Sequence, residues 1–159
     1  MTKTPSTPPR IVYAANRRIG AECLRMLVDA GITPVALMIP NGPEAEATDD
    51  MRKLLPTVPV FLGKDGVKEA IQKLPALAPQ YLLSVHFPLI LPPEILAVPS
   101  AGTLNLHPAF LPWNRGWHTP SWAILDGTPY GATLHWIDSG VDTGPIALQR
   151  QIEIQPTET

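Results

Sequence analysis

The stretch RIVYAANRRIGAECLRMLVDAG, residues 10–31, joins a strand pattern directly to a helix pattern. Its first six residues are short, mostly apolar and partly β-branched, which is typical of a buried strand. Residues 20–30 predict a helix, because Leu24 and Leu27 recur on one stripe and Gly31 follows as a C-terminal stop. A strand followed at once by an amphipathic helix predicts the beginning of an alternating β/α chain.

The same alternation continues toward the middle of the chain. Further strand patterns occupy residues 33–39, 58–62, 81–85 and 102–107. A helix is expected over residues 65–74, a polar loop over residues 40–50, and a turn or short helix over residues 93–96. Strands that alternate with helices predict a parallel sheet with right-handed crossovers. In such sheets ligands bind beyond the carboxyl ends of the strands.

The last third of the chain has a different pattern. Thr119 is placed as a helix N-cap, Pro120 suits the first helical position, and Gly127 ends that helix. Residues 131–138 and 145–154 both alternate and are joined by SGVDTG, which predicts an antiparallel hairpin. The expected fold class is therefore α/β and Rossmann-like: a mainly parallel sheet with helices on both faces and a C-terminal antiparallel hairpin.

Length and composition restrict the class of protein. The 159 residues, 45% of them hydrophobic, predict one globular domain over residues 10–159, preceded by a flexible segment of residues 1–9. Lys and Arg number 12 against 14 Asp and Glu, so we expect no general attraction to nucleic acid or to an anionic membrane surface. A single cysteine fits a reducing compartment, and the sequence shows no transmembrane-length apolar run and no signal-peptide core. We expect a cytoplasmic protein.

Three polar residues near the probable strand ends are candidates for chemistry. Asn105 and His107 lie two apart, so they share one face of the strand, which Pro108 ends. Asp142 follows in the loop SGVDTG. On spacing alone, an Asn and a His are more often structural, and an Asp between glycines is most often a turn residue. His135 alternates out of phase with its apolar neighbours and is interpreted as a plain strand residue.

Taken together, these segments resemble a known family. LNLHPAFLPWNRG, residues 104–116, followed by GATLHWIDSGVDTGPI, residues 131–146, resembles the folate-dependent formyltransferase superfamily. Its members include glycinamide ribonucleotide, methionyl-tRNA and sugar N-formyltransferases. The resemblance extends from residue 10 to the end of the chain and is most specific over residues 104–144. The matching positions are Asn105, His107, Leu111, Pro112, Arg115, Gly116 and Asp142.

The resemblance implies a reaction and a role for each catalytic candidate. Formyl transfer from 10-formyltetrahydrofolate to an amine passes through a tetrahedral oxyanion, to which Asn105 and a protonated His107 would donate hydrogen bonds. Asp142 would favour the charged form of His107, hold its orientation, and relay the proton that leaves the amine. The chemistry needs no metal, and the sequence shows no ligand cluster with the usual spacing.

The resemblance also assigns binding residues. The residues expected to bind the folate are Phe87, Leu89, Ile90, Leu91, Asp138, Gly140 and Val141. Without the family, the first four of these would be interpreted as core that leads into a turn. The residues expected to contact the acceptor are Arg115, Gly116, Trp117 and His118.

The acceptor is expected to be the amine of a nucleotide-linked amino sugar. The segment LPWNRGWHTPSWAI, residues 111–124, resembles the sugar enzymes most, whereas the ribonucleotide enzymes carry a Gly/Ser-rich phosphate loop where this chain has YAANRRIG. The tRNA enzymes carry a further C-terminal domain. Methionyl-tRNA and glycinamide ribonucleotide remain alternative acceptors. Two functions other than formyl transfer also remain: a formyltetrahydrofolate hydrolase, or a non-catalytic folate-binding module.

Two departures from the family accompany these expectations. Ala109 stands where the family usually has a small polar residue, and the sequence ends at Thr159, before the helix with which related domains continue. The expected domain therefore lacks its usual C-terminal continuation. A hairpin with an uncovered edge invites association, so a homodimer is a further expectation.

Overall fold

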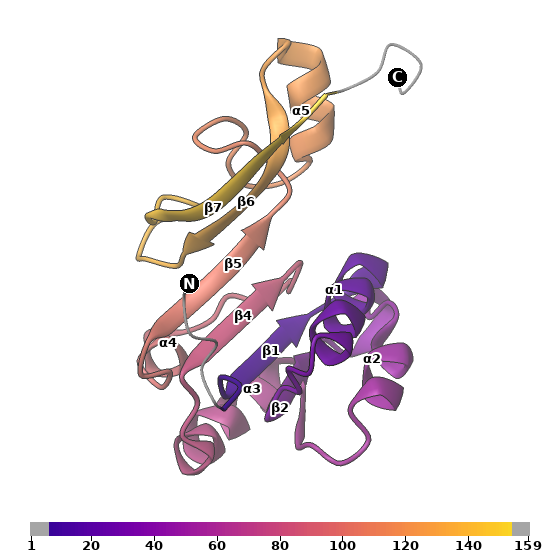
Figure 1. The fold of residues 1–159 in the computed structure, drawn as a ribbon, viewed down its shortest axis with the longest axis vertical. Helices are drawn as coiled ribbons and strands as arrows, with labels where there is room; N and C mark the ends of the chain where they lie inside the picture. The colour runs from indigo at the N-terminus through magenta and orange to yellow at the C-terminus, as the bar shows by residue number, and fades with distance from the viewer. Residues whose placement is uncertain (1–6, 154–159) are drawn as a thin grey trace. The chain divides into compact units, whose positions relative to one another are not determined.

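A computed structural model describes residues 7–153 of the chain (Figure 1). The chain divides into two compact units, one ending at Thr103 and the other beginning at Leu104. Strand β5 (Gly102–His107) begins in the last residues of the first unit. None of the helices in the described part of the chain is long and apolar enough to cross a membrane.

The first unit is built on four parallel strands. These are β1 (Ile11–Ala15), β2 (Ala36–Ile39), β3 (Val60–Leu62) and β4 (Tyr81–Val85). Their order is β3-β2-β1-β4, with β1 pairing in parallel with both β2 and β4. β1 and β2 are buried along their whole length, as strands covered on both faces must be.

Four α-helices and two short 3-10 helices accompany these strands. The α-helices are α1 (Arg17–Asp29), α2 (Thr48–Leu54), α3 (Gly63–Lys73) and α4 (Pro93–Leu96), and the 3-10 helices are η1 (Gly42–Glu44) and η2 (Leu74–Leu77). α1 packs against α2, and α3 packs against α4. The buried apolar cluster is formed by Val12, Ala14, Ala36, Met38, Phe61, Val67, Ala70, Leu74, Leu82 and Ile95.

The second unit is an antiparallel sheet with one helix. β6 (Tyr130–Trp136) pairs antiparallel with both β5 and β7 (Ile146–Ile152), and α5 (Thr119–Asp126) precedes β6. The predicted C-terminal hairpin is therefore confirmed. Figure 1 shows β7 running beside β6 and α5 following the long loop after β5.

Three local predictions are wrong, each for a physical reason. The expected polar loop over residues 40–50 contains the start of α2, because Met51 is buried and the acidic residues before it suit a helix amino end. α1 begins at Arg17 rather than at residue 20, because the Asn16 side chain holds residues 44–46 and the chain turns there. Thr119 is the first helical residue and not the cap, since its hydroxyl donates to the Pro108 carbonyl instead.

Candidate functional site

The site is built on one face of the second unit's sheet. In the antiparallel register Asn105 lies opposite His135, and His107 lies opposite Thr133. Directly paired residues share a face, so all four side chains emerge from the same side of β5 and β6. Along β6 the residues on this polar face are the buried ones, while those on the apolar face are only half-buried.

A tight loop after β6 brings Asp142 back over this face. Asp138 folds the loop, because its carboxylate accepts hydrogen bonds from Gly140 N–H at 2.9 Å and from the Thr143 hydroxyl at 2.6 Å. A Cβ on Gly144 would lie 1.8 Å from the Trp136 carbonyl oxygen, so this close approach requires glycine. Asp142 itself has a φ of 50°, in the left-handed region that Asp tolerates better than most residues.

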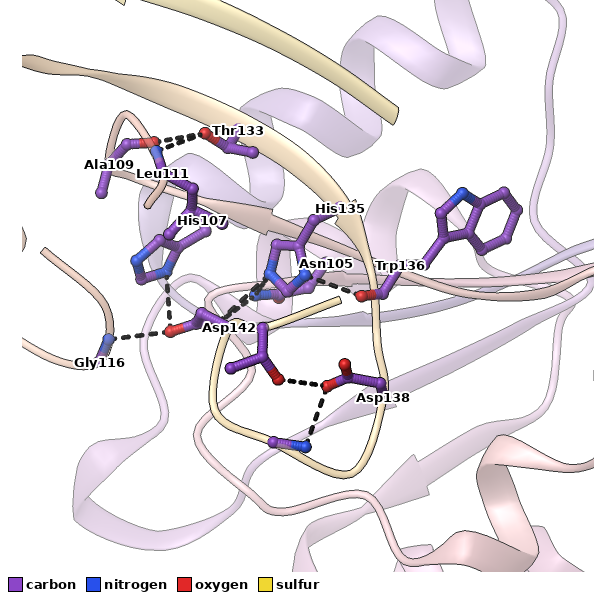
Figure 2. Close-up of polar contacts among 12 residues, drawn as sticks. Asn105, His107, Ala109, Leu111, Gly116, Thr133, His135, Trp136, Asp138 and Asp142 are labelled. Carbon is purple, nitrogen blue, oxygen red and sulfur yellow. Dashed lines mark hydrogen bonds and ion pairs between the residues drawn. The ribbon is translucent and has the colours of Figure 1, made fainter. Parts of the chain in front are cut away.

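The Asp142 carboxylate lies between two buried imidazoles (Figure 2). Its Oδ2 is 3.5 Å from His107 Nδ1 and accepts a hydrogen bond of 2.9 Å from Gly116 N–H. Its Oδ1 is 3.3 Å from His135 Nε2 and 3.5 Å from Asn105 Nδ2. One carboxylate therefore gathers the amide, both histidines and a backbone N–H.

Backbone carbonyls settle which ring nitrogens carry a proton. His107 Nε2 is 3.1 Å from the Asn114 carbonyl, and His135 Nδ1 is 2.9 Å from the Trp136 carbonyl. A carbonyl only accepts, so both of these nitrogens are donors. The other nitrogen of each ring faces Asp142, and a hydrogen bond there requires a second proton and hence an imidazolium.

The Asn105 amide is a second possible hydrogen-bond partner for His135 Nε2. Asn105 Nδ2 lies 3.3 Å from His135 Nε2. A neutral His135 accepts from this amide, whereas a protonated His135 donates to Asp142 and leaves one amide N–H without an acceptor on the ring. The protonation state of His135 therefore controls what the Asn105 amide can bind.

The electrostatics favour the charged pair of Asp142 and His135. Burial by itself raises the pKa of Asp142, but the hydrogen bonds from His135 and Gly116 and the nearby imidazoles outweigh it, and the pKa lies below its ordinary value. Burial by itself lowers the pKa of His135. The hydrogen bonds to Asp142 and to the Trp136 carbonyl, together with the nearby carboxylate charges, outweigh burial, and the pKa lies above its ordinary value.

The three catalytic candidates from the sequence meet in space, and His135 joins them. The sequence predicts a plain strand residue at His135, because apolar residues normally mark the buried side of a strand. In β6 the polar side is the buried one, so the usual rule predicts the wrong buried face. The pairing of His135 with Asn105 could be seen only with the register of β5 against β6.

The expected folate-binding residues fall in both units. In the first unit, Phe87, Leu89 and Leu91 are half-buried against the apolar cluster, and Ile90 is 93% exposed. In the second unit, Asp138, Gly140 and Val141 belong to the loop that carries Asp142; Asp138 and Gly140 shape it, and Val141 is 69% exposed.

The expected acceptor residues include one, Gly116, that contacts Asp142. The Gly116 N–H holds the Asp142 carboxylate directly. Arg115, Trp117 and His118 are exposed, and so is Trp113 on the same loop. Among residues 7–153, no three His, Cys, Asp or Glu side chains are arranged to hold a metal ion.

Comparison with known proteins shows the family of the chain. Residues 32–159 match the formyl transferase family. The chain belongs to this family. The chain is 33% identical to the methionyl-tRNA formyltransferase of Thermotoga neapolitana, over 94% of this chain and 51% of that protein. The family member described here thus spans about half the length of the curated relatives it matches.

Solved structures of formyltransferases share the fold. The phosphoribosylglycinamide formyltransferase of Bacillus halodurans superposes with a TM-score of 0.76 at 23% identity, over 94% of this chain and 81% of that one. A sugar N-formyltransferase from Shewanella gives a TM-score of 0.64 at 17% identity, over 92% of this chain and 58% of that one. The family resemblance and the Rossmann-like α/β fold class predicted from the sequence are both confirmed.

Proposed function

We propose that this formyltransferase family member transfers a formyl group from 10-formyltetrahydrofolate to the amine of an acceptor. The proposal depends on one observation: the Asp142 carboxylate lies within 3.5 Å of ring nitrogens of both His107 and His135, with the Asn105 amide at the same oxygen as His135. A buried group of donors around one anion suits a carbonyl oxygen that gains negative charge during acyl transfer.

The reaction balances without another reactant. The acceptor nitrogen forms a bond to the formyl carbon, the bond from that carbon to folate N10 breaks, and a proton passes from the amine to N10. The donor supplies the activated formyl carbon. Everything else required is positioning, donation to one oxygen, and movement of one proton.

The residues of the chain divide these tasks. A protonated His135 donates to Asp142, which frees an N–H of Asn105 to stabilise the formyl oxygen. His107 supplies the second donor through Nε2–H, which the Asn114 carbonyl holds until the formyl oxygen takes its place. Asp142 keeps the His135 imidazole charged and relays the proton that the amine loses to folate N10.

For the acceptor, the relatives and the site surface favour different molecules. Of the similarities reported above, the methionyl-tRNA formyltransferase has the highest identity, and this supports the amino group of methionyl-tRNA as the acceptor. The amino sugar expected from the sequence is the second candidate. It is favoured by Trp113 and Trp117, exposed aromatic rings of the loop that carries Gly116, on which a sugar or base can stack.

An acceptor panel tests the proposal. The chain is mixed with 10-formyltetrahydrofolate and, separately, methionyl-tRNA, a nucleotide-linked amino sugar, glycinamide ribonucleotide or no acceptor. Loss of the formyl donor and the mass of the product are followed together. We expect consumption only with an amine acceptor, and a product that carries the formyl group.

The other outcomes each contradict the proposal in a recognisable way. Consumption without an acceptor, with release of formate, indicates hydrolysis. Binding of the folate without consumption, whatever the acceptor, indicates a binding module. The same assay compares Asp142→Asn, which changes the site, with a matched control, Asp65→Asn. Asp65 is an exposed carboxylate in the first unit.

A further inference from the structure

Gln149 differs from its neighbours on the edge strand β7. The other six residues of β7 are exposed, and Gln149 alone is half-buried. It pairs with Thr133 on β6, and Thr133 pairs with His107 on β5. The three side chains therefore form a row across the sheet, on the face that carries the site.

The hydrogen bonds along this row use every available donor. Gln149 Nε2 has two N–H groups, and it donates to the Leu111 carbonyl at 2.7 Å and to the Thr133 hydroxyl at 2.9 Å. The Thr133 hydroxyl donates to the Ala109 carbonyl at 2.7 Å and also accepts from Leu111 N–H at 3.2 Å. Both polar groups of Leu111 are thereby tied to the sheet.

The segment held in this way leads directly to the site. Ala109 and Leu111 are buried, and the same loop then presents the Asn114 carbonyl to His107 Nε2 and Gly116 N–H to Asp142. The loop residues between β5 and α5 form no helix or strand, so their backbone depends on such contacts for its position.

We propose that Gln149 is a positioning residue for His107. From the edge of the sheet it fixes residues 109–111, and this segment sets the Asn114 carbonyl that orients the imidazole. The consequence for catalysis rests on the proposed function; the hold on the loop does not. Both hydrogen bonds come from the Nε2 amide group, and a carboxylate of the same shape has no N–H to donate. Gln149→Glu therefore removes both donors and keeps the side-chain shape, whereas Gln149→Ala removes the shape as well.

Amide hydrogen exchange tests the hold on the loop without any substrate. The Leu111 N–H is expected to exchange at least tenfold faster in both variants than in the parent. The matched control is Gln151→Ala, two residues along the same face of β7, where the side chain is exposed; its Leu111 exchange is expected to equal the parent's. Unchanged Leu111 exchange in both Gln149 variants overturns the proposal.

Steady-state kinetics test the consequence for His107. We expect kcat to fall by about 10- to 100-fold in the Gln149 variants, with KM for either substrate changed less than about twofold, as for misoriented catalytic groups. Faster Leu111 exchange with unchanged kcat overturns the positioning role.

Failure of the proposed function has a different signature. If the parent chain consumes no formyl donor with any acceptor, the function fails, and the exchange experiment still decides whether Gln149 holds the loop. Thermal unfolding of each variant checks that it folds. If Gln149→Ala does not fold, Gln149→Glu, which keeps the side-chain shape, decides the result.

Discussion

His107 has both ring nitrogens directed at named partners, Asn114 and Asp142. Its replacement by Ala removes one of the two donors proposed for the formyl oxygen. We expect His107→Ala to lower kcat/KM for formyl transfer by about 100- to 1000-fold, the usual cost of losing one oxyanion donor. Circular dichroism should show a nearly unchanged fold. Full activity in this variant would remove His107 from the mechanism.

The Asp142–His135 pair makes stability depend on pH in two directions. The pKa of His135 is raised, so its contribution to the free energy of unfolding is complete below its ordinary value of 6.5 and is lost as pH rises through the folded value. The pKa of Asp142 is lowered, so its contribution is complete above its ordinary value of 3.8 and is lost as pH falls through the folded value.

The contribution of this pair to stability should therefore be greatest between these two ordinary values, and Asp142→Asn removes that contribution. We expect the difference in unfolding free energy between parent and Asp142→Asn to be largest near about pH 5.5 and to shrink toward about pH 9. Urea unfolding at several pH values measures this difference. A difference that stays constant across the range would mean that the carboxylate and the imidazole are not coupled.

At the scale of elements, the sheet of the second unit depends on a close approach of β6 to β7. A Cβ on Gly131 would lie 2.2 Å from the Arg150 carbonyl oxygen, a backbone atom that cannot move aside cheaply. We expect Gly131→Ala to destabilise the protein by about 1–3 kcal/mol, as overpacking does. Protection of the β7 amides from exchange should fall with it.

Gly127→Ala is the matched control for this prediction. Gly127 ends α5 with a φ of 61° and has open space where a Cβ would lie, so alanine there strains the backbone without pushing strands apart. Gly127→Ala should lower the free energy of unfolding through this strain, but the protection of the β7 amides from exchange, relative to the rest of the chain, should stay unchanged. If both variants reduced β7 protection equally, the contact between strands would not be the cause.

At the scale of the whole molecule, charge limits how strongly this chain can hold a nucleic acid. Acidic residues exceed basic ones by 14 to 12, so few phosphates can be neutralised. We expect tRNA to bind this chain alone with a Kd weaker than about 10⁻⁵ M at physiological salt, and with a shallow salt dependence. Filter binding at two salt concentrations measures both. Nanomolar affinity with a steep salt slope would contradict the prediction.

Much of the fold followed from local patterns. Strands β4 and β5 have the predicted bounds, because an apolar strand between turn residues is a signal carried by a few neighbouring positions. The sequence did not predict α2, because this helix depends on the burial of Met51, and a mostly polar segment gives no sign that one of its residues is buried. Gly127 ends α5 as predicted, since a left-handed C-terminal residue favours glycine in any fold.

The sequence by itself determined the family, the strand that carries Asn105 and His107, and the glycine-rich loop that carries Asp142. Only the tertiary structure decided that His135 faces the same carboxylate and that Gln149 secures the loop above it. Both depend on strand register and on which side of the sheet is covered. Alternation within one strand gives two faces but does not say which of them is buried, and only the packing of loops over the sheet makes that choice.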